Sequence, residues 1–152
     1  MKCPKLTPVA RFILSFAPAF VLQLIFPWYF SGYVDRFYST FFGLKALVVS
    51  GLIALFAQHA FKHEGTPYTP GATPNVLLTR GLYAISRHPV YLALVLAMGG
   101  LAGVLDTLWL LIDAALLWIA LDRCVIPMEE TKLHEVFGEA YEAYCGITRR
   151  WL

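Results

Sequence analysis

Four apolar runs alternate with polar segments along the chain. They cover approximately residues 9–29, 43–61, 90–105 and 108–126. An α-helix rises 1.5 Å per residue, so about 20 apolar residues span the ~30 Å hydrocarbon core of a bilayer. Three of the runs reach or approach that length, and the run at 90–105 is shorter. The pattern predicts an all-α integral membrane protein with about four transmembrane helices.

Only Asp106 and Thr107 separate the last two runs, which predicts a tight helical hairpin. Asp106 is a candidate N-cap for the second arm, because its carboxylate can accept hydrogen bonds from free backbone N–H groups. Gly99 and Gly103 form a Gly-x-x-x-Gly pattern in the first arm. Such small residues let helices approach closely, so we expect helix packing there.

Two polar segments flank this hairpin. Residues 62–89 are rich in Gly, Pro and Thr, which predicts a loop. In residues 128–145, Leu133, Phe137 and Tyr141 fall on one stripe while glutamates fall mostly elsewhere. This spacing predicts one amphipathic C-terminal helix that lies against the membrane or the bundle.

The distribution of Lys and Arg predicts the orientation. Lys2, Lys5 and Arg11 precede the first run, Lys62, Arg80 and Arg87 lie in the loop, and Lys132, Arg149 and Arg150 lie near the end. The opposite side carries chiefly Arg36 and Lys45. The positive-inside rule then places both termini and the loop 62–89 in the cytosol, in a multi-pass protein of the cytoplasmic membrane. The first run also has a signal peptide's basic start, but it exceeds the usual 7–15 apolar residues, so we expect a retained helix.

Composition supports a single membrane domain over residues 1–152. Hydrophobic residues make up 59% of the chain and charged residues only 14%, against roughly a quarter in globular proteins. The net charge of +2 provides no basic stripe for nucleic acid, so we expect no such partner. The three cysteines are far apart and predict no disulfide framework.

Polar groups capable of chemistry gather in three segments on the predicted cytosolic side, 80–91, 123–130 and 149–151, and their co-location suggests a single site. Ionisable groups at membrane depth are costly and tend to be paired or functional. The alternatives are an interfacial anchor for Arg87 and a favourable helix dipole for Glu129 or Glu130. Asp113, within the fourth run, is either a buried hydrogen-bonded group or faces a substrate. His59 and His63 have the i, i+4 spacing of a metal-binding arm, but only Glu64 is a nearby third ligand, so we expect no metal.

Two ordered motifs resemble the isoprenylcysteine carboxyl methyltransferase and phospholipid methyltransferase superfamily. The first is Gly81-Leu82-Tyr83 followed by Arg87-His88-Pro89-Val90-Tyr91, and the second is Glu129-Glu130-x-x-Leu133 followed by Phe137-Gly138, Tyr141, Tyr144 and the end Arg149-Arg150-Trp151. The resemblance extends over roughly residues 65–152. Ala93 stands where the family often has glycine.

The resemblance implies a methyltransferase that uses S-adenosylmethionine. It implies a cofactor site of Tyr83, Arg87, His88, Pro89, Tyr91, Glu129 and Glu130, with Arg87, Arg123 and Glu130 as catalytic candidates. Either Arg87 or Arg123 would bind the cofactor's carboxylate, and either Glu129 or Glu130 its ammonium. The implied acceptor is membrane-partitioned or small and apolar, and reacts through a carboxylate, amine or thiol. The alternatives are an NADPH-dependent membrane reductase of sterol-like substrates and a non-enzymatic membrane scaffold protein.

Overall fold

The computed structural model describes residues 8–65 and 75–152, and in this part of the chain every regular element is helical. The α-helices are α1 (Pro8–Ile25), α2 (Arg36–His63), α3 (Pro89–Val104), α4 (Leu108–Ala120), α5 (Ile126–Phe137) and α6 (Glu139–Ile147). A π-helical turn, Leu121–Val125, joins α4 to α5, and short 3-10 turns occur at Phe30–Gly32 and Gly81–Ala84. The all-α prediction is therefore confirmed for the described residues. Lys2, Lys5 and part of the expected loop, 66–74, lie outside them.

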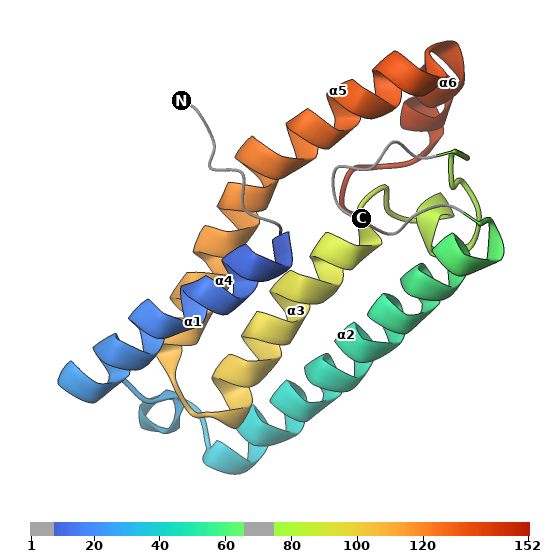
Figure 1. Ribbon diagram of the computed structural model, residues 1–152. Helices are drawn as coiled ribbons and strands as arrows, with labels where there is room; N and C mark the ends of the chain where they lie inside the picture. The colour runs from blue at the N-terminus through green and yellow to red at the C-terminus, as the bar shows by residue number, and fades with distance from the viewer. Residues whose placement is uncertain (1–7, 66–74) are drawn as a thin grey trace.

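Helix α3 lies at the centre of the bundle, where it packs against α2 and α4, and α1 packs against α4 (Figure 1). Helix α5 extends α4 beyond the bundle, and α6 then turns the chain back. The C-terminus consequently lies near the end of the bundle where α3 begins (Figure 1). This return brings residues from both predicted motifs together.

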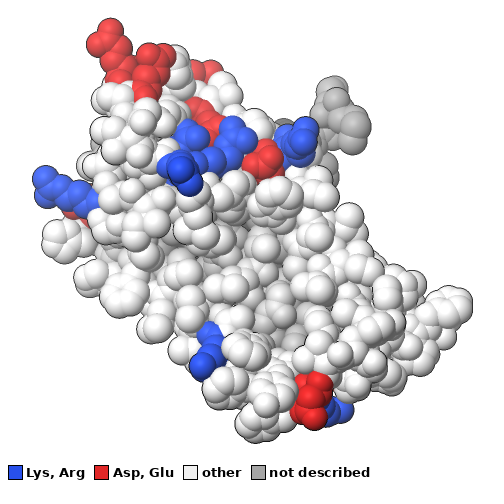
Figure 2. Space-filling view, turned by 180° about the vertical axis from the view of Figure 1, so that it is seen from behind, with Lys and Arg blue, Asp and Glu red and all other residues white. Residues whose placement is uncertain are grey.

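Helix α2 is the one described helix that is both long and apolar enough to cross a membrane. Its 28 residues begin at Arg36, earlier than the expected start near residue 43. The apolar helices Phe16–Ile25 and Pro89–Val104 are shorter. Figure 2 shows charged side chains gathered towards two ends of the molecule, with a broad uncharged band between them. Large apolar side chains such as Phe42, Leu55 and Phe56 on α2 are exposed, which fits a protein surrounded by lipid.

Small residues explain the close approach of α2 and α3. A Cβ atom added at Gly43 would lie 2.7 Å from the Gly100 carbonyl oxygen, and one at Gly103 would lie 2.6 Å from the Ser39 carbonyl oxygen. The Ser50 hydroxyl donates to the Ala93 carbonyl at 2.7 Å, which fixes the two helices to each other. Of the expected glycine pair, Gly103 is at this contact, whereas Gly99 has open space around it, so α2 packs on a different face of α3.

The turn between α3 and α4 differs from the expected cap. The N-cap of α4 is Thr107, and Asp106 instead adopts a positive φ of 54° in the turn. The buried Asp106 carboxylate accepts hydrogen bonds of 2.8 Å from both the backbone N–H and the hydroxyl of Ser31, and Arg36 lies 3.5 Å away. Asp106 thus connects this turn to the segment between α1 and α2, because a buried carboxylate requires partners.

The single amphipathic helix expected at 128–145 is divided in the structure. The π turn at Leu121–Val125 carries the chain from α4 into α5 without a break, and Pro127 lies at the start of α5. Proline has no backbone N–H to donate within a helix, and a π turn accommodates this missing donor. The extra residue of the π turn also rotates the side chains that follow it. Gly138, with φ of 50°, then ends α5 and reverses the chain into α6. The amphipathic pattern predicted helix correctly, but it gave no indication that the chain reverses direction at Gly138.

Candidate functional site

Charged side chains from four segments meet where α2 ends and α3 begins. The segments are the start of α3 with the residues before it, the π turn, the start of α5, and the residues after α6. We call the following set the charged cluster: Arg87, His88, Tyr91, Asp122, Glu129, Glu130 and Arg150. The sequence therefore brings both motifs into one site through the continuous α4–α5 helix and the reversal at Gly138.

Glu130 is the centre of the charged cluster. Its carboxylate lies 3.2 Å from Arg87 Nη1 and 3.5 Å from His88 Nε2. Arg150 donates to both of its oxygens, from Nε at 3.2 Å and from Nη2 at 2.7 Å. The Glu130 side chain is only 16% exposed, so a carboxylate with this little water around it is stabilised chiefly by the guanidiniums of Arg87 and Arg150.

The pKa of Glu130 reflects this environment. Burial raises the pKa, but the hydrogen bonds from His88 and Arg150 and the charge of Arg87 outweigh it and lower the pKa to about 2. The same hydrogen bond with Glu130 raises the pKa of Arg150. Glu130 is therefore ionised at any physiological pH, and its charge is already shared among protein cations.

Glu129 has a different environment from its neighbour. Its side chain is 46% exposed, and Oε2 accepts a hydrogen bond of 2.6 Å from the Tyr91 hydroxyl. His88 Nδ1 lies 3.8 Å from the same oxygen. The His88 and Tyr91 rings stack beside it, with centroids 5.6 Å apart and planes at 10°. Glu129 thus combines an accessible carboxylate with two aromatic faces, an arrangement that favours a positively charged ligand.

The buried Nε atom of Arg87 has no hydrogen-bond partner among the described residues, and the Arg87 side chain is 14% exposed. The buried His88 Nε2 lies 3.5 Å from the Glu130 carboxylate. A buried donor left without a partner is costly, so such groups are often completed by a ligand. The guanidinium of Arg87 can therefore bind an anionic group in addition to Glu130.

The remaining candidates from the sequence occupy other positions. The Arg123 side chain is 82% exposed and lies 3.8 Å from Asp122 at the edge of the charged cluster, outside the contacts around Glu130. Tyr83 is buried against Phe61, and its carbonyl accepts a hydrogen bond from the Tyr144 hydroxyl. Pro89 is the buried first residue of α3 and fixes where that helix begins.

The sequence places Arg150 in one of the three polar segments that suggest a single site, but it assigns Arg150 no role there beyond orientation and the basic-aromatic end of the family pattern. Only the fold shows that Arg150 reaches back to Glu130, 20 positions earlier in the chain. Its position next to Trp151 in the second motif was the one available signal.

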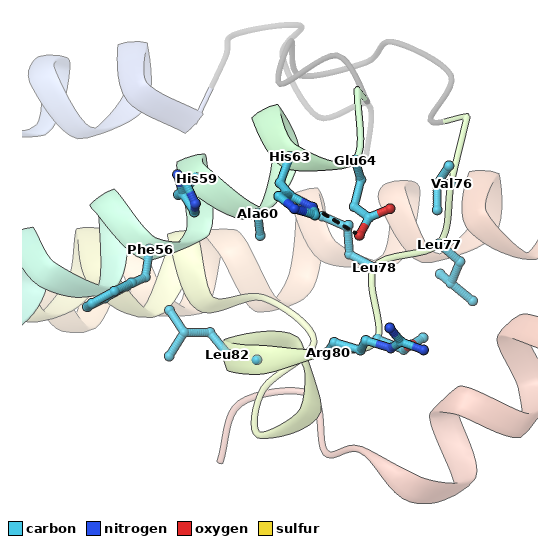
Figure 3. A pocket seen from close by; sticks show the side chains of 12 residues that line it. Phe56, His59, Ala60, His63, Glu64, Val76, Leu77, Leu78, Arg80 and Leu82 are labelled. Atoms are coloured by element: carbon cyan, nitrogen blue, oxygen red, sulfur yellow. Dashed lines mark ion pairs between the residues drawn. The ribbon is translucent and has the colours of Figure 1, made fainter.

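A cavity of about 810 Å³ lies between the end of α2 and the segment 76–82, beside the turn that holds Tyr83 (Figure 3). Its walls include Phe56, Leu78 and Leu82, and its polar lining includes His59, His63, Glu64 and Arg80. A second hollow of about 490 Å³ runs along α2 and shares Phe56 and His59 with the first. The two hollows join the apolar surface of α2 to a polar rim, which suits a ligand with an apolar body and a polar end.

The histidine pair His59 and His63 lines this cavity. The rings of His59 and His63 are 6.4 Å apart, and His63 lies 3.6 Å from Glu64 (Figure 3). Within residues 8–65 and 75–152, no group of three or more His, Cys, Asp or Glu side chains is placed to hold a metal ion. The i, i+4 spacing places both histidines on the α2 wall of the cavity.

Comparison with known proteins adds a family to this geometry. Residues 36–140 match the family model of phospholipid methyltransferases, a range that includes α2 to α5 and both carboxylates of the second motif. No curated protein matches the chain, and no solved structure matches it. The family match covers well over half of the chain and agrees with the resemblance of the two motifs. The chain therefore belongs to the phospholipid methyltransferase family, part of the superfamily of membrane methyltransferases.

Proposed function

We propose that this protein transfers a methyl group from S-adenosylmethionine to a membrane-partitioned or small apolar acceptor. The observation that carries the proposal is the pairing, in one site, of a buried Arg87 guanidinium with an unpaired Nε and an accessible Glu129 carboxylate beside two stacked rings. Membership of a methyltransferase family supports the reaction class. No separate base or metal is required to activate the methyl group.

The residues present fit the groups of S-adenosylmethionine. Arg87 would bind the cofactor's carboxylate through Nε, since a guanidinium can donate two parallel hydrogen bonds to it. Glu129 would pair with the ammonium, because its carboxylate is accessible while that of Glu130 is saturated by Arg87, His88 and Arg150. The rings of His88 and Tyr91 would face the adenine or the sulfonium.

The cofactor supplies a methyl carbon activated by the adjacent positively charged sulfur. When held by Arg87 and Glu129, the cofactor would donate this methyl group to a lone pair on the acceptor, and the electron pair of the carbon–sulfur bond would stay on sulfur. The protein contributes alignment, since an in-line displacement depends strongly on orientation. The start of α3 and the ion pairs around Glu130 would provide that alignment on the donor side.

The cavity beside α2 supports an apolar acceptor. Phe56 lies on both hollows and on the exposed apolar surface of α2, so a lipid-like molecule could reach the polar rim from the bilayer. The family description, phospholipid methyltransferase, agrees with a lipid acceptor. The reacting atom would be a carboxylate oxygen, an amine nitrogen or a thiol sulfur.

The same geometry supports the orientation proposed from the charges. Arg80, Arg87 and Arg150 lie at the end of the bundle that holds the charged cluster. We place this end, and both termini, at the cytosolic face of a multi-pass protein, because the water-soluble donor is available there. The acceptor then arrives from the membrane side along α2.

Cofactor binding tests the proposed function. We expect the purified protein in detergent to bind S-adenosylmethionine in a calorimetric titration, and not to bind NADPH. Binding of NADPH alone would support the reductase instead, and binding of neither cofactor would support a non-enzymatic scaffold. The titration requires no knowledge of the acceptor.

Filling the cavity should separate acceptor from donor. We expect Leu78→Trp to reduce methylation of lipid extracts at least about tenfold, because a bulky ring occupies the proposed acceptor space. The affinity for S-adenosylmethionine should change less than about twofold, since Leu78 has no part in the proposed donor contacts. Leu105→Trp, at an exposed position between α3 and α4, is the matched control and should leave both quantities unchanged. Normal lipid methylation by Leu78→Trp would exclude this cavity as the acceptor site.

A further inference from the structure

The last residues of the chain form a strap across the charged cluster. After α6 ends at Ile147, Thr148 is extended and Arg149–Trp151 lie against the residues that precede α3. We call Arg149–Trp151 the C-terminal strap. The Arg149 carbonyl accepts a hydrogen bond of 3.0 Å from the Arg87 backbone N–H, and the Arg150 carbonyl accepts one of 3.3 Å from the Ser86 hydroxyl. The strap therefore fixes the backbone from which Arg87 extends.

The side chains of the strap reach the opposite wall of the site. Trp151 Nε1 donates to Asp122 Oδ1 at 2.9 Å, and Arg150 Nη1 lies 3.4 Å from the same oxygen. The Trp151 ring also packs near that of Trp118 on α4, with centroids 6.1 Å apart. Asp122 belongs to the π turn, so the strap connects the residues before α3 to the junction of α4 and α5.

Arg150 occupies the centre of this connection. Its guanidinium donates to both oxygens of Glu130 and to Asp122, which is the fork geometry that arginine provides and lysine does not. Two guanidiniums, those of Arg87 and Arg150, thereby face two carboxylates, those of Glu130 and Asp122. Without Arg150, Glu130 would keep one guanidinium partner, and Asp122 would keep Trp151 and the exposed Arg123, among the residues that the structure describes.

We propose that Arg150 is a positioning residue of the donor site. By holding Glu130 and Asp122 together, it prevents the Glu130 carboxylate from forming a second hydrogen bond with the Arg87 guanidinium. This inference rests on the proposed function. Glu130 has one oxygen near Arg87 and both oxygens bonded to Arg150, so Arg87 contacts it through Nη1 only. The Nε edge of Arg87 is thereby left for an external carboxylate. Arg150 acts on the donor through Glu130 and does not bind it.

A double-mutant cycle on donor affinity tests the inference. We expect Arg150→Gln to weaken S-adenosylmethionine binding at least about tenfold in calorimetric titration of the full chain in detergent. In a Glu130→Gln background, Arg150→Gln should change the affinity less than about twofold, because the Glu130 carboxylate through which Arg150 acts on Arg87 is already absent. Lys132→Gln, which removes one exposed positive charge from α5, is the control and should leave affinity unchanged.

Arg150→Lys is a second variant that tests the inference if Arg150→Gln does not fold. It retains the positive charge but cannot donate to both Glu130 oxygens and to Asp122 at once, so we expect an intermediate loss of affinity. Size-exclusion profiles and thermal unfolding midpoints establish which variants are folded. If Arg150→Gln and Arg150→Lys bind as the unmodified protein does, or if their effects add fully to that of Glu130→Gln, Arg150 has no positioning role. An unmodified protein that binds no S-adenosylmethionine would overturn the proposed function, and this inference with it.

Discussion

Glu129→Gln and Glu130→Gln should produce opposite phenotypes although the two residues are adjacent. We expect Glu129→Gln to abolish most donor binding while the protein stays as stable as before. Glu130→Gln should instead destabilise the fold, with a weaker and secondary loss of donor binding. The reason is the difference in partners: Glu129 is half-exposed beside Tyr91, whereas Glu130 is enclosed by Arg87, His88 and Arg150.

The magnitudes follow from these environments. Removing the carboxylate proposed to pair with the cofactor's ammonium should weaken binding by about 2 kcal/mol, or roughly thirtyfold, because Glu129 is only partly desolvated. Removing Glu130 leaves two guanidiniums facing each other with one fewer carboxylate, a change that typically destabilises a fold by about 3 kcal/mol. Such a loss should lower the thermal unfolding midpoint by roughly 5–10 °C.

The pH dependence of stability provides an independent check on Glu130. Its pKa in the folded protein is about 2, below the ordinary value of 4.5, so its ionised form stabilises the fold above about pH 4.5. That contribution is lost as the pH falls from 4.5 towards 2. The unmodified protein should therefore lose stability over this range, whereas Glu130→Gln should lose less. Thermal unfolding across the series measures this, and equal acid sensitivity of both proteins would contradict the assignment.

The two glutamate variants also test the proposed division of labour. Calorimetric titration with S-adenosylmethionine and thermal unfolding of the same preparations give both quantities. Two equally mild losses of affinity would remove this pair from the donor site. A loss of affinity confined to Glu130→Gln would exchange the roles of the two residues.

Much of the helical architecture could be predicted from the sequence because apolar run length and loop composition are local properties. Helix α3 (Pro89–Val104) and the start of α4 (Leu108) lie within a residue or so of the expected boundaries, since Pro89 and the pair Asp106-Thr107 interrupt the pattern. The start of α2 was missed because Arg36 to Phe42 mix charged, polar and aromatic residues. Hydropathy does not identify a helix there, whereas the Asp35 side chain, which accepts from the Phe37 N–H, provides an N-cap.

The candidate site could be predicted only in part from the sequence, because side-chain directions are not local properties. Arg87, His88, Glu129 and Glu130 share a recognisable pattern, and the structure brings them together. The choice between Arg87 and Arg123, and the role of Arg150, depend on side-chain direction, which is set by the π turn and the reversal at Gly138. A single extra residue in a helical turn rotates every following side chain by about 100°. No local pattern in the sequence revealed that rotation.

Arg87→Lys should damage donor binding even though the positive charge is retained. Nη1 of Arg87 lies 3.2 Å from Glu130, and we propose that its buried Nε, which has no partner among the described residues, binds the cofactor's carboxylate. A lysine ammonium is a single point of charge, and pairing with Glu130 would occupy it. We therefore expect a loss of at least one charge-assisted hydrogen bond, about 1.5–3 kcal/mol, and roughly a tenfold or greater weakening of S-adenosylmethionine binding.

Arg123→Lys is the matched comparison, because it makes the same chemical change at the other arginine that the sequence allowed for the cofactor's carboxylate. Its side chain is 82% exposed and contacts Asp122 at 3.8 Å, so exchange for lysine should leave affinity within about twofold. Thermal unfolding should also distinguish the two roles of Arg87, since Arg87→Lys keeps a cation beside Glu130 and should remain folded. If donor affinity survives in Arg87→Lys but falls in Arg123→Lys, the cofactor's carboxylate binds on the exposed side of the π turn, and Arg87 serves only to neutralise Glu130.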